Sequence, residues 1–309
     1  MRYTADHVRV SVPATAGNLG PGFDALGMAL GVTDEVEVWA LGSRAVEIEI
    51  EGEGADSLPR DETHLMVRAI RAAADAVGAS HTGLRIVARN AIPHGRGLGS
   101  SGAAVVAGIA ALRGLITEPE LLGPEQMLRL ATQFEGHPDN AAPAIYGGAT
   151  AAWQDADGAH AVPLTIASGI ETAVLIPRSI LPTKHARAVL PESVPHADAA
   201  FNVGRAALLV AALAGAPERL FAATEDRLHQ DYRAAMLPAA SAMVARLREQ
   251  GLAAVVSGAG PSVLVIGENL AAAGLETGPL DWAEGIGGDR WRCVHTRGSV
   301  PGATATRID

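Results

Sequence analysis

The sequence is poor in cysteine, lysine and aromatic residues, and each shortage excludes a class of protein. Cys293 is the only cysteine among 309 residues, so no disulfide can form within the chain and no cysteine-based zinc site is indicated. Lys184 is the only lysine among 24 basic residues. Aromatic residues make up 4% of the chain, so close packing of small and aliphatic side chains must replace large rings. The single thiol fits a reducing compartment.

Positive charge and long apolar runs are also scarce. The formal net charge is -10, which argues against a surface made for nucleic acid or anionic lipid. No hydrophobic signal core follows Met1, and the longest apolar runs, near 103–112 and 206–216, are too short to span a bilayer. We therefore expect a cytoplasmic protein that binds neither nucleic acid nor membrane.

The pattern of apolar residues indicates a mixed α+β chain. Strands are predicted at 8–12, 35–40, 45–50, 84–88, 171–176, 253–257 and 263–266, and helices at 63–77, 103–115, 124–135, 200–213, 217–228 and 238–250. The span 136–149 is rich in turn residues, and no repeat or low-complexity linker divides the chain. We expect two α+β domains, residues 1–165 and 166–309, that meet at a cleft.

The most informative segment is the glycine-rich loop 93–102, PHGRGLGSSG, which runs into an apolar helical stretch. Glycine lets a backbone approach a polyphosphate, and free N–H groups at the start of a helix favour an anion. No lysine follows Gly99 as in the GxxxxGK[ST] phosphate loop, so the neutralising charge must come from a metal or from elsewhere. Two alternatives stay open: a GxGxxG dinucleotide motif at Gly97, Gly99 and Gly102, and a purely structural glycine turn.

Two further turns could contribute to a site. The turn 12–24, VPATAGNLGPGFD, carries Asn18 and Asp24. These side chains can cap the turn itself, as Asn and Asp often do, or they can face a cleft, where Asp24 would bind a cationic group. The turn 257–262, SGAGPS, lies between two apolar strands and is either a tight hairpin or part of the same cleft.

A metal site is predicted beside the segment 135–140, EGHPDN. By itself this segment resembles a surface turn. Beside a phosphate loop, Glu135 is a candidate oxygen ligand for Mg²⁺, which takes one or two protein oxygens and leaves its other positions for phosphate and water. Ser101, at the start of the helix that follows the loop, could supply the second oxygen.

These segments together resemble the GHMP kinase superfamily, and within it the branch that phosphorylates the amino acid homoserine. The three superfamily motifs occur in order, at 12–24, 93–103 and 255–262, within a resemblance that runs from about 8 to 266. The features shared with that branch are the form of the first motif, the segment 137–140, Thr183 with Arg187, and Tyr232 with Arg233.

The resemblance implies a ribosomal protein S5 domain 2-like N-terminal domain and a ferredoxin-like C-terminal domain, with ATP and Mg²⁺ in the cleft. It implies Mg²⁺ ligands at Ser101 and Glu135, and it leaves His64 where an asparagine of the family helps to hold adenine. The residues implied in ATP binding are Pro93, His94, Gly95, Arg96, Gly97, Leu98, Gly99, Ser100, Ser101, Gly102, Ala103, Gly258 and Gly260.

The resemblance also implies an acceptor site. Its members are Asn18, Asp24, His137, Asn140, Thr183, Arg187 and Arg233. L-homoserine carries a carboxylate, an ammonium and a hydroxyl, and so requires an arginine, an acid and a polar contact to the hydroxyl. The implied reaction is the ATP-dependent phosphorylation of that hydroxyl in threonine biosynthesis, and a homodimer is expected from the family.

We assign catalytic roles to Asn140, Ser101 and Glu135. Asp139 is an alternative general base, and we favour attack without a dedicated base, because phosphoryl transfer depends chiefly on positioning and charge neutralisation. Two other functions stay open: a kinase of this superfamily for another small alcohol, such as mevalonate or shikimate, and a catalytically silent relative that only binds ligand.

Overall fold

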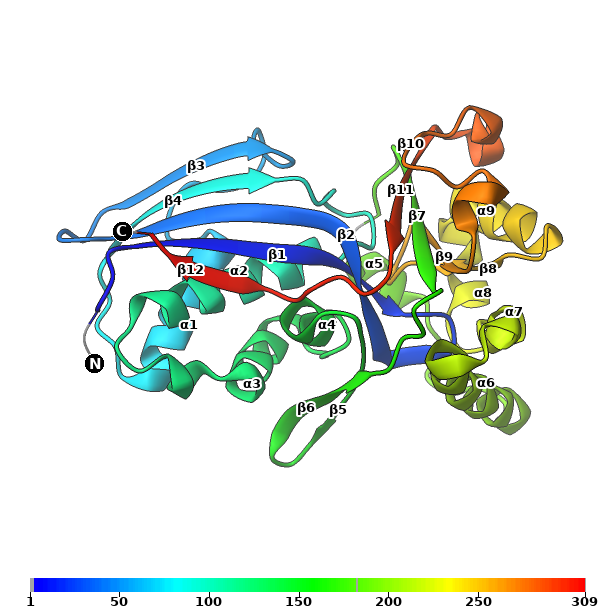
Figure 1. Ribbon diagram of the computed structural model, residues 1–309, viewed down its shortest axis with the longest axis horizontal. Helices are drawn as coiled ribbons and strands as arrows, with labels where there is room; N and C mark the ends of the chain where they lie inside the picture. The colour runs from blue at the N-terminus through cyan, green and yellow to red at the C-terminus, as the bar shows by residue number, and fades with distance from the viewer. Residues whose placement is uncertain (1–2, 182, 309) are drawn as a thin grey trace.

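The computed structural model describes residues 3–181 and 183–308, without the side chains of Thr183, Lys184 and Arg297. It contains two sheets with helices packed on them (Figure 1). The elements, joined by loops and short 3₁₀ turns, are β1 His7–Asn18, β2 Gly22–Leu41, β3 Val46–Gly52, α1 Leu65–Val77, β4 Gly83–Asn90, α2 Ser100–Leu115, α3 Pro124–Glu135, α4 Ala141–Tyr146, β5 Ala149–Asp155, β6 Gly158–Leu164, β7 Glu171–Pro177, α5 Thr183–Ala188, α6 His196–Gly215, α7 Leu220–Ala223, α8 Gln230–Arg233, α9 Pro238–Glu249, β8 Ala253–Val256, β9 Val263–Gly267, β10 Gly278–Pro279, β11 Trp291–Arg297 and β12 Thr304–Arg307.

The first sheet has the strand order β12-β1-β2-β4-β3, with β5 and β6 attached to β2. Helices α1 to α4 lie on one side of it (Figure 1). In β1, Val8, Val10 and Val12 are fully buried while Arg9 and Ser11 between them are not, because alternate side chains of a strand point to opposite faces. The apolar face of this strand therefore packs on α2.

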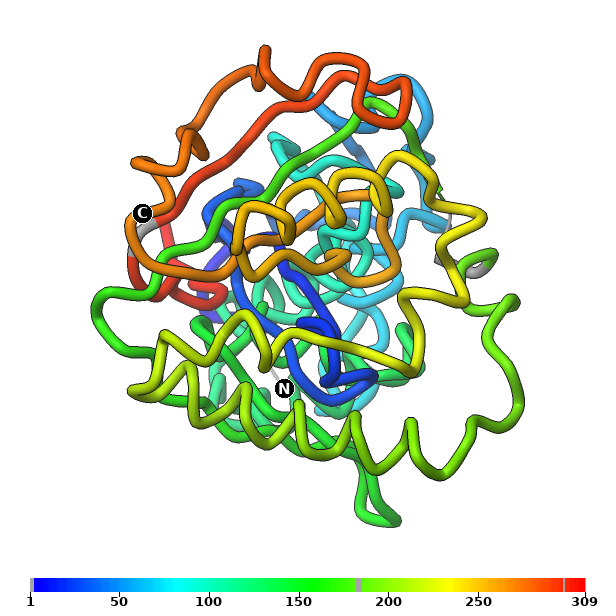
Figure 2. Tube along the Cα trace, turned by 90° about the vertical axis from the view of Figure 1, so that its right-hand side faces the viewer, coloured from blue at the N-terminus to red at the C-terminus, as the bar shows by residue number. Residues whose placement is uncertain are grey.

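The second sheet is antiparallel, in the order β10-β11-β7-β9-β8. One face packs on α9, where Met243 and Leu247 are buried with Ala254 and Val256 of β8. The opposite face joins the larger core, which also includes Leu209 of α6. Figure 2 shows this end of the molecule, with α6 along its lower edge.

Most predicted strands and helices are present, and the α+β class is confirmed. The turn prediction for 136–149 is wrong in part, because α4 occupies its second half; Ala141, Ala142 and Ala144 are fully buried there, so tertiary packing stabilises a helix too short to be predicted from periodicity. The hairpin of β5 and β6 was not predicted. The helix predicted at 217–228 is confined to a 3₁₀ turn and α7.

The end of the chain returns to the first sheet. Strand β12 pairs antiparallel with β1, so that Val8 lies opposite Arg307. The two sheets match the two predicted domains. Residues 304–307, however, pair with the first sheet, although the strands just before them in the chain, β10 and β11, belong to the second. The division at 165 and 166 therefore stays a prediction.

One described helix, α6, is long and apolar enough to cross a membrane by length and composition alone. The sequence prediction had found no run of sufficient length, because it counted only the uninterrupted apolar residues. A helix of a folded domain passes the same test, and α6 buries Leu209, Ala212 and Leu213 in the protein core. It also places Arg205 near Glu225, with nitrogen and oxygen 2.7 Å apart.

Candidate active site

A cavity of about 560 Å³ lies between the glycine loop, the turn after β1 and the start of α4. It confirms that the loop, the first turn and the segment 135–140 lie together, although they are distant in sequence. The predicted residues that line this cavity are Asn18, Asp24, Gly95, Gly97, Leu98, Gly99, Ser100, Ser101, Glu135, His137, Asn140, Arg187, Arg233 and Gly258.

The backbone of the loop explains its glycines. Gly95, Gly97 and Gly99 have φ angles of 64°, 68° and 66°, which are strained for residues with a Cβ. A Cβ on Gly97 would meet the carbonyl oxygen of Ser257 and lie 2.7 Å from the nitrogen of Gly260. Gly97 is therefore required both by its conformation and by the close approach of the third motif.

The loop leaves the N-terminus of α2 open to the cavity. Gly99 precedes the helix and there is no side-chain cap, so the first N–H groups are available to an anion. Contacts from the other motifs hold the loop. Ser257 Oγ donates to the carbonyl oxygen of Gly97 at 2.7 Å, and the N–H of Thr15 donates to the carbonyl oxygen of Leu98 at 3.0 Å. The structure thus favours the phosphate-loop interpretation over a purely structural turn.

Six of the residues predicted to bind ATP do not line this cavity. His94 faces a neighbouring pocket, Gly102 and Ala103 are buried within α2, and Gly260 packs near Leu237. Pro93 and Arg96 line a different hollow of about 510 Å³.

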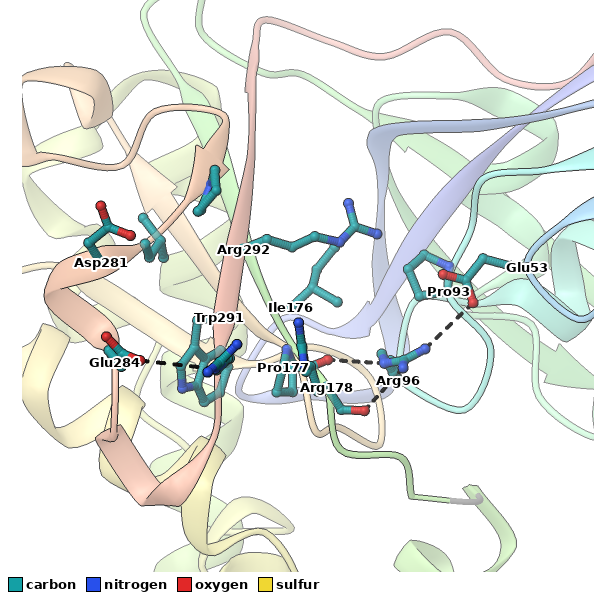
Figure 3. Close-up of a pocket in the computed structure, with 13 residues that line it drawn as sticks. Glu53, Pro93, Arg96, Ile176, Pro177, Arg178, Asp281, Glu284, Trp291 and Arg292 are labelled. Atoms are coloured by element: carbon teal, nitrogen blue, oxygen red, sulfur yellow. Dashed lines mark hydrogen bonds and ion pairs between the residues drawn. The ribbon is translucent and has the colours of Figure 1, made fainter.

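Arg96 is held in that second hollow by the end of β7 and by Glu53 (Figure 3). Its Nε donates to the carbonyl oxygen of Pro177 at 3.0 Å, and its Nη2 donates to that of Arg178 at 3.1 Å. Its Nη1 lies 3.7 Å from a carboxylate oxygen of Glu53. The only charged side chain of the loop therefore connects the loop to the end of β7 rather than facing the 560 Å³ cavity.

A pocket of about 390 Å³ adjoins the cavity and shares Ser100 and Ser101 with it. Leu58, Pro59 and Met66 contribute apolar surface, as an aromatic base requires. His64, where an asparagine was expected, lies in this pocket, but its Nδ1 accepts the N–H of Met66 at 3.2 Å and caps α1. Burial lowers the pKa of His64 and keeps it neutral.

Ser101 and Glu135 meet at the edge of the cavity. Ser101 Oγ donates to Glu135 Oε1 at 2.6 Å. Neighbouring ligands of an octahedral Mg²⁺ ion lie about 2.9 Å apart, since each is 2.0–2.1 Å from the metal. One hydroxyl and one carboxylate oxygen at this spacing fit Mg²⁺, with the remaining positions left for phosphate and water.

A second group of potential metal ligands consists of Asp24, His137 and Asp139, whose ligand atoms lie within 4.8 Å of one another. Its charges are already compensated. His137 Nδ1 contacts Asp139 Oδ1, and this hydrogen bond raises the pKa of His137, while Asp24 is paired with Arg187. The group is therefore less suited to a cation than Ser101 with Glu135.

The first turn reverses sharply and directs polar groups to the cavity. Asn18 and Asp24 adopt φ angles of 70° and 55°, which are uncommon for non-glycine residues. Asn18 Oδ1 accepts the N–H of Asp24 at 3.0 Å, and its Nδ2 donates to the carbonyl oxygen of Gly258 at 3.0 Å. Asn18 thus caps its own turn and also connects it to the third motif, while Asp24 extends its carboxylate into the cavity.

Two arginines lie beside this turn. Arg187 donates from Nη1 and Nη2 to the two oxygens of Asp24 at 2.9 and 2.6 Å. Arg233 is 2% exposed, and burial lowers its pKa. Both guanidinium carbons lie over the ring of Phe23, at 5.5 and 5.6 Å from its centre. Thr183 begins the short helix that carries Arg187, but its side chain lies outside the described part of the structure.

Asn140 is fixed by two neighbours. Its Oδ1 accepts from Thr15 Oγ1 at 3.0 Å, and its Nδ2 donates to Asp139 Oδ1 at 3.3 Å. Asp139 is 1% exposed and also contacts His137. A Cβ on Gly17 would clash with this Asp139 carboxylate, so the glycine leaves room for the pair.

Sequence reasoning missed several residues of the site. Thr15 and Gly17 stand in the first motif, and their proximity to Asn140 comes only from folding. Phe134 and Ala259 line the cavity beside predicted residues. His229 was noticed only as part of the segment that contains Arg233, and its burial had no sequence signal.

Comparisons with known proteins agree with this geometry. Residues 64–148 match the GHMP kinases N terminal domain, and residues 206–275 match the GHMP kinases C terminal. A homoserine kinase of Clavibacter michiganensis is 52% identical over 266 residues, with 86% of this chain and 84% of the relative covered. One of Streptomyces coelicolor is 50% identical over 283 residues, which is 91% of each chain.

Solved structures show the same fold. A homoserine kinase from Cytophaga hutchinsonii superposes with a TM-score of 0.83 at 25% identity and covers 99% of both chains. A putative homoserine kinase from Listeria monocytogenes gives a TM-score of 0.75 at 30% identity, over 98% of this chain and all of that one. The predicted fold class is therefore confirmed, and the chain belongs to the homoserine kinase family of the GHMP kinases.

Proposed function

We propose that the protein transfers the γ-phosphate of ATP to the hydroxyl of L-homoserine. The observation that carries the proposal is one cavity with two different walls. The glycine loop and the N-terminus of α2 offer N–H groups to phosphate, and Asp24 of the first turn, Arg187 of α5 and Arg233 of α8 offer one negative and two positive charges on the facing wall. A zwitterionic alcohol matches the second wall, because its carboxylate and ammonium need opposite charges close together.

The acceptor replaces an existing ion pair. In the free protein Asp24 and Arg187 neutralise each other at 2.6 Å. L-homoserine supplies an ammonium for Asp24 and a carboxylate for Arg187 and Arg233, so each protein charge keeps a partner when the pair opens. An acceptor without an α-amino group, such as mevalonate or shikimate, leaves Asp24 without a new partner, which disfavours these alternatives.

The nucleotide occupies the loop side of the cavity. Its base fits the 390 Å³ pocket, and its phosphates pass Ser100 and Ser101, which line both spaces. Ser101 and Glu135 would hold Mg²⁺, which would supply charge neutralisation for the phosphates. The loop N–H groups and the positive end of α2 add to that neutralisation.

Among the residues that the structure describes, no free general base lies beside Asn140. Asp139 is the nearest carboxylate to Asn140, but it already accepts hydrogen bonds from His137 and Asn140. We therefore assign Asn140 to orient the acceptor hydroxyl and give Asp139 the role of holding Asn140 and His137. As the hydroxyl oxygen forms its bond to the γ-phosphorus, the bond from that phosphorus to ADP breaks, and the hydroxyl proton passes to an oxygen of the transferred phosphoryl group, because transfer of this kind needs little base assistance.

An ADP-release assay over a panel of small alcohols tests the proposal. L-homoserine, D-homoserine, mevalonate, shikimate and 3-aminopropan-1-ol are each supplied with ATP and Mg²⁺. Turnover with L-homoserine far above the others is expected. Turnover of mevalonate without that of L-homoserine contradicts the proposal, and absence of turnover with every alcohol indicates a silent relative. The cytoplasmic location and the homodimer stay predictions.

A further inference from the structure

The imidazole of His229 is fully buried behind the acceptor wall. Its Nδ1 accepts a hydrogen bond from Arg233 Nη1 at 3.0 Å, and its Nε2–H donates to the carbonyl oxygen of Gly20 at 2.8 Å. These partners define the neutral tautomer with hydrogen on Nε2, because a guanidinium only donates and a carbonyl only accepts. The ring thus connects Arg233 directly to the turn that contains Asn18 and Asp24.

The groups around the ring keep it neutral. Burial lowers the pKa of His229, and the charge of Arg233 acts in the same direction. Asp226 and Asp24 act in the opposite direction, but the Asp226 carboxylate, 3.6 Å from Nε2, already accepts the backbone N–H groups of residues 228 to 230 at 2.8–3.1 Å. The ring of Phe23 covers the imidazole, with their centres 5.3 Å apart.

Two of the three guanidinium nitrogens of Arg233, Nε and Nη1, make hydrogen bonds within the protein. Its Nε donates to the carbonyl oxygen of Ala186 at 2.9 Å, and Nη1 donates to His229. Among the described residues Nη2 has no hydrogen-bond partner, and Arg233 lines the cavity. Removing the imidazole bond frees the guanidinium to rotate about its long side chain, which weakens any contact that depends on the direction of Nη2.

We propose that His229 is a positioning residue for the acceptor. It holds Arg233 with Nη2 toward the cavity and ties it, through Gly20, to the turn that carries Asp24. The carboxylate-binding and ammonium-binding groups are thereby kept at a fixed spacing, which selects α-amino acids. The inference rests on the proposed function, in which Arg233 binds the carboxylate of L-homoserine.

The test compares two substitutions in the full-length enzyme. His229→Phe keeps an aromatic ring against Phe23 and removes both hydrogen bonds, whereas His229→Gln keeps one acceptor and one donor. We expect His229→Phe to raise the KM for L-homoserine about 10-fold, as for the loss of one hydrogen bond to a charged group. Its KM for ATP and its kcat at saturating L-homoserine should change little, and His229→Gln should recover most of the loss. His160→Leu, on the distant β6, is the matched control.

A truncated acceptor separates positioning from a general structural effect. 3-Aminopropan-1-ol lacks the carboxylate, so His229→Phe should leave its kcat/KM unchanged, and adding His229→Phe to Arg233→Leu should cause no further loss with L-homoserine. Equal losses with both acceptors and with ATP overturn the inference. If the wild type phosphorylates L-homoserine and His229→Phe retains its KM, the inference fails while the function stands; no turnover of L-homoserine by the wild type refutes the function itself.

A measurement on the unmodified enzyme guards against variants that do not fold. In ¹⁵N-histidine-labelled wild type, the shifts of His229 should report hydrogen on Nε2, and the Nδ1 signal should move on addition of L-homoserine but not of 3-aminopropan-1-ol. Hydrogen on Nδ1, or an Nδ1 signal that ignores both ligands, overturns the inference.

Discussion

The phosphate wall of the cavity is one continuous stretch of chain, residues 95–101, whereas the acceptor wall collects side chains from the first turn, α5 and α8. The first wall presents backbone N–H groups and needs glycine at particular φ angles. The second wall presents charged side chains, and buried contacts behind them set their directions. A local motif can therefore build a phosphate site, but selecting the acceptor requires tertiary structure.

The two walls also treat titratable groups differently. On the nucleotide side, burial lowers the pKa values of His64 and His94 and raises that of Asp34 to about 6, so neutral forms are favoured. On the acceptor side, hydrogen bonds to carboxylates raise the pKa values of His137 and Arg187, so the charged forms of these two are favoured, whereas burial lowers the pKa values of Arg233 and His229. The nucleotide side thus suits an apolar base, and the paired charges of Asp24 and Arg187 suit a zwitterion.

The largest expected effect is at Glu135, the proposed ligand of Mg²⁺ between the walls. Glu135→Gln should lower turnover about 100-fold or more, since a bound metal contributes several kcal/mol of charge stabilisation. The only described hydrogen bond of this side chain is with Ser101, so the melting temperature should hardly change. Steady-state kinetics over a range of Mg²⁺ concentrations measure the effect, and Glu125→Gln, in the exposed first turn of the same helix, is the control. Full activity of Glu135→Gln at low Mg²⁺ shows that another group holds the metal.

Within the acceptor wall, the buried arginine should matter more than the exposed one. Arg233→Leu should lower kcat/KM for L-homoserine roughly 10- to 150-fold, the loss of one charge-assisted contact of about 1.5 to 3 kcal/mol. Arg187→Leu should cost less and depend more on salt, because the Arg187 side chain is 46% exposed and solvent screens it. Kinetics at two salt concentrations distinguish them, with Arg246→Leu on the outer face of α9 as control. Equal effects of Arg187→Leu and Arg233→Leu contradict this ranking.

Next in size is the backbone strain of the phosphate wall. Gly97→Ala places a Cβ at a φ of 68° and against the carbonyl oxygen of Ser257, which should lower the free energy of unfolding by about 1 to 3 kcal/mol. The KM for ATP should rise while that for L-homoserine changes less. Urea denaturation and kinetics with each substrate measure the two effects. An unaltered KM for ATP means that the loop does not hold the phosphates in this conformation.

Asp34, in the 390 Å³ pocket, should make the free energy of unfolding depend on pH. Asp34 accepts the N–H groups of Ala91 and Ile92, yet burial raises its pKa from 3.8 to about 6. The folded chain thus binds this proton more tightly than the unfolded chain. As the pH rises from about 4 to about 6, the free energy of unfolding should therefore fall by at most about 3 kcal/mol. Asp34→Asn keeps an oxygen acceptor and should remove that part of the slope. Urea denaturation from pH 3.5 to 7 checks it; identical slopes in wild type and variant contradict the assignment.

The sequence predicted the phosphate wall better than its surroundings because the signal there is local. Glycine at positions 95, 97 and 99 indicates a backbone with positive φ angles, which these residues adopt. The helix after them is predicted by its apolar run. The sequence could not show that Arg96 donates to the carbonyl groups of Pro177 and Arg178 rather than facing the 560 Å³ cavity. It could not show either that Thr15 meets Asn140, since such contacts join segments more than 80 residues apart. The acceptor wall was predicted through resemblance, and its supporting side chain His229 was missed.

The smallest effect is expected at Gly102, the last glycine of the loop, where the loop helix approaches Asn140. Gly102 lies within α2, and a Cβ there would be 3.6 Å from Asn140 Cβ and 3.7 Å from Glu135 Oε2, which is ordinary contact. Gly102→Ala should therefore raise the free energy of unfolding by up to about 1 kcal/mol through helix propensity. Kinetic constants for both substrates should stay unchanged, in contrast to Gly97→Ala. A loss of stability in Gly102→Ala would contradict the expected gain in helix propensity. A loss of turnover with stability retained would mean that the two walls move closer together during the reaction, since a methyl group at this position tests the space between the loop helix and Asn140.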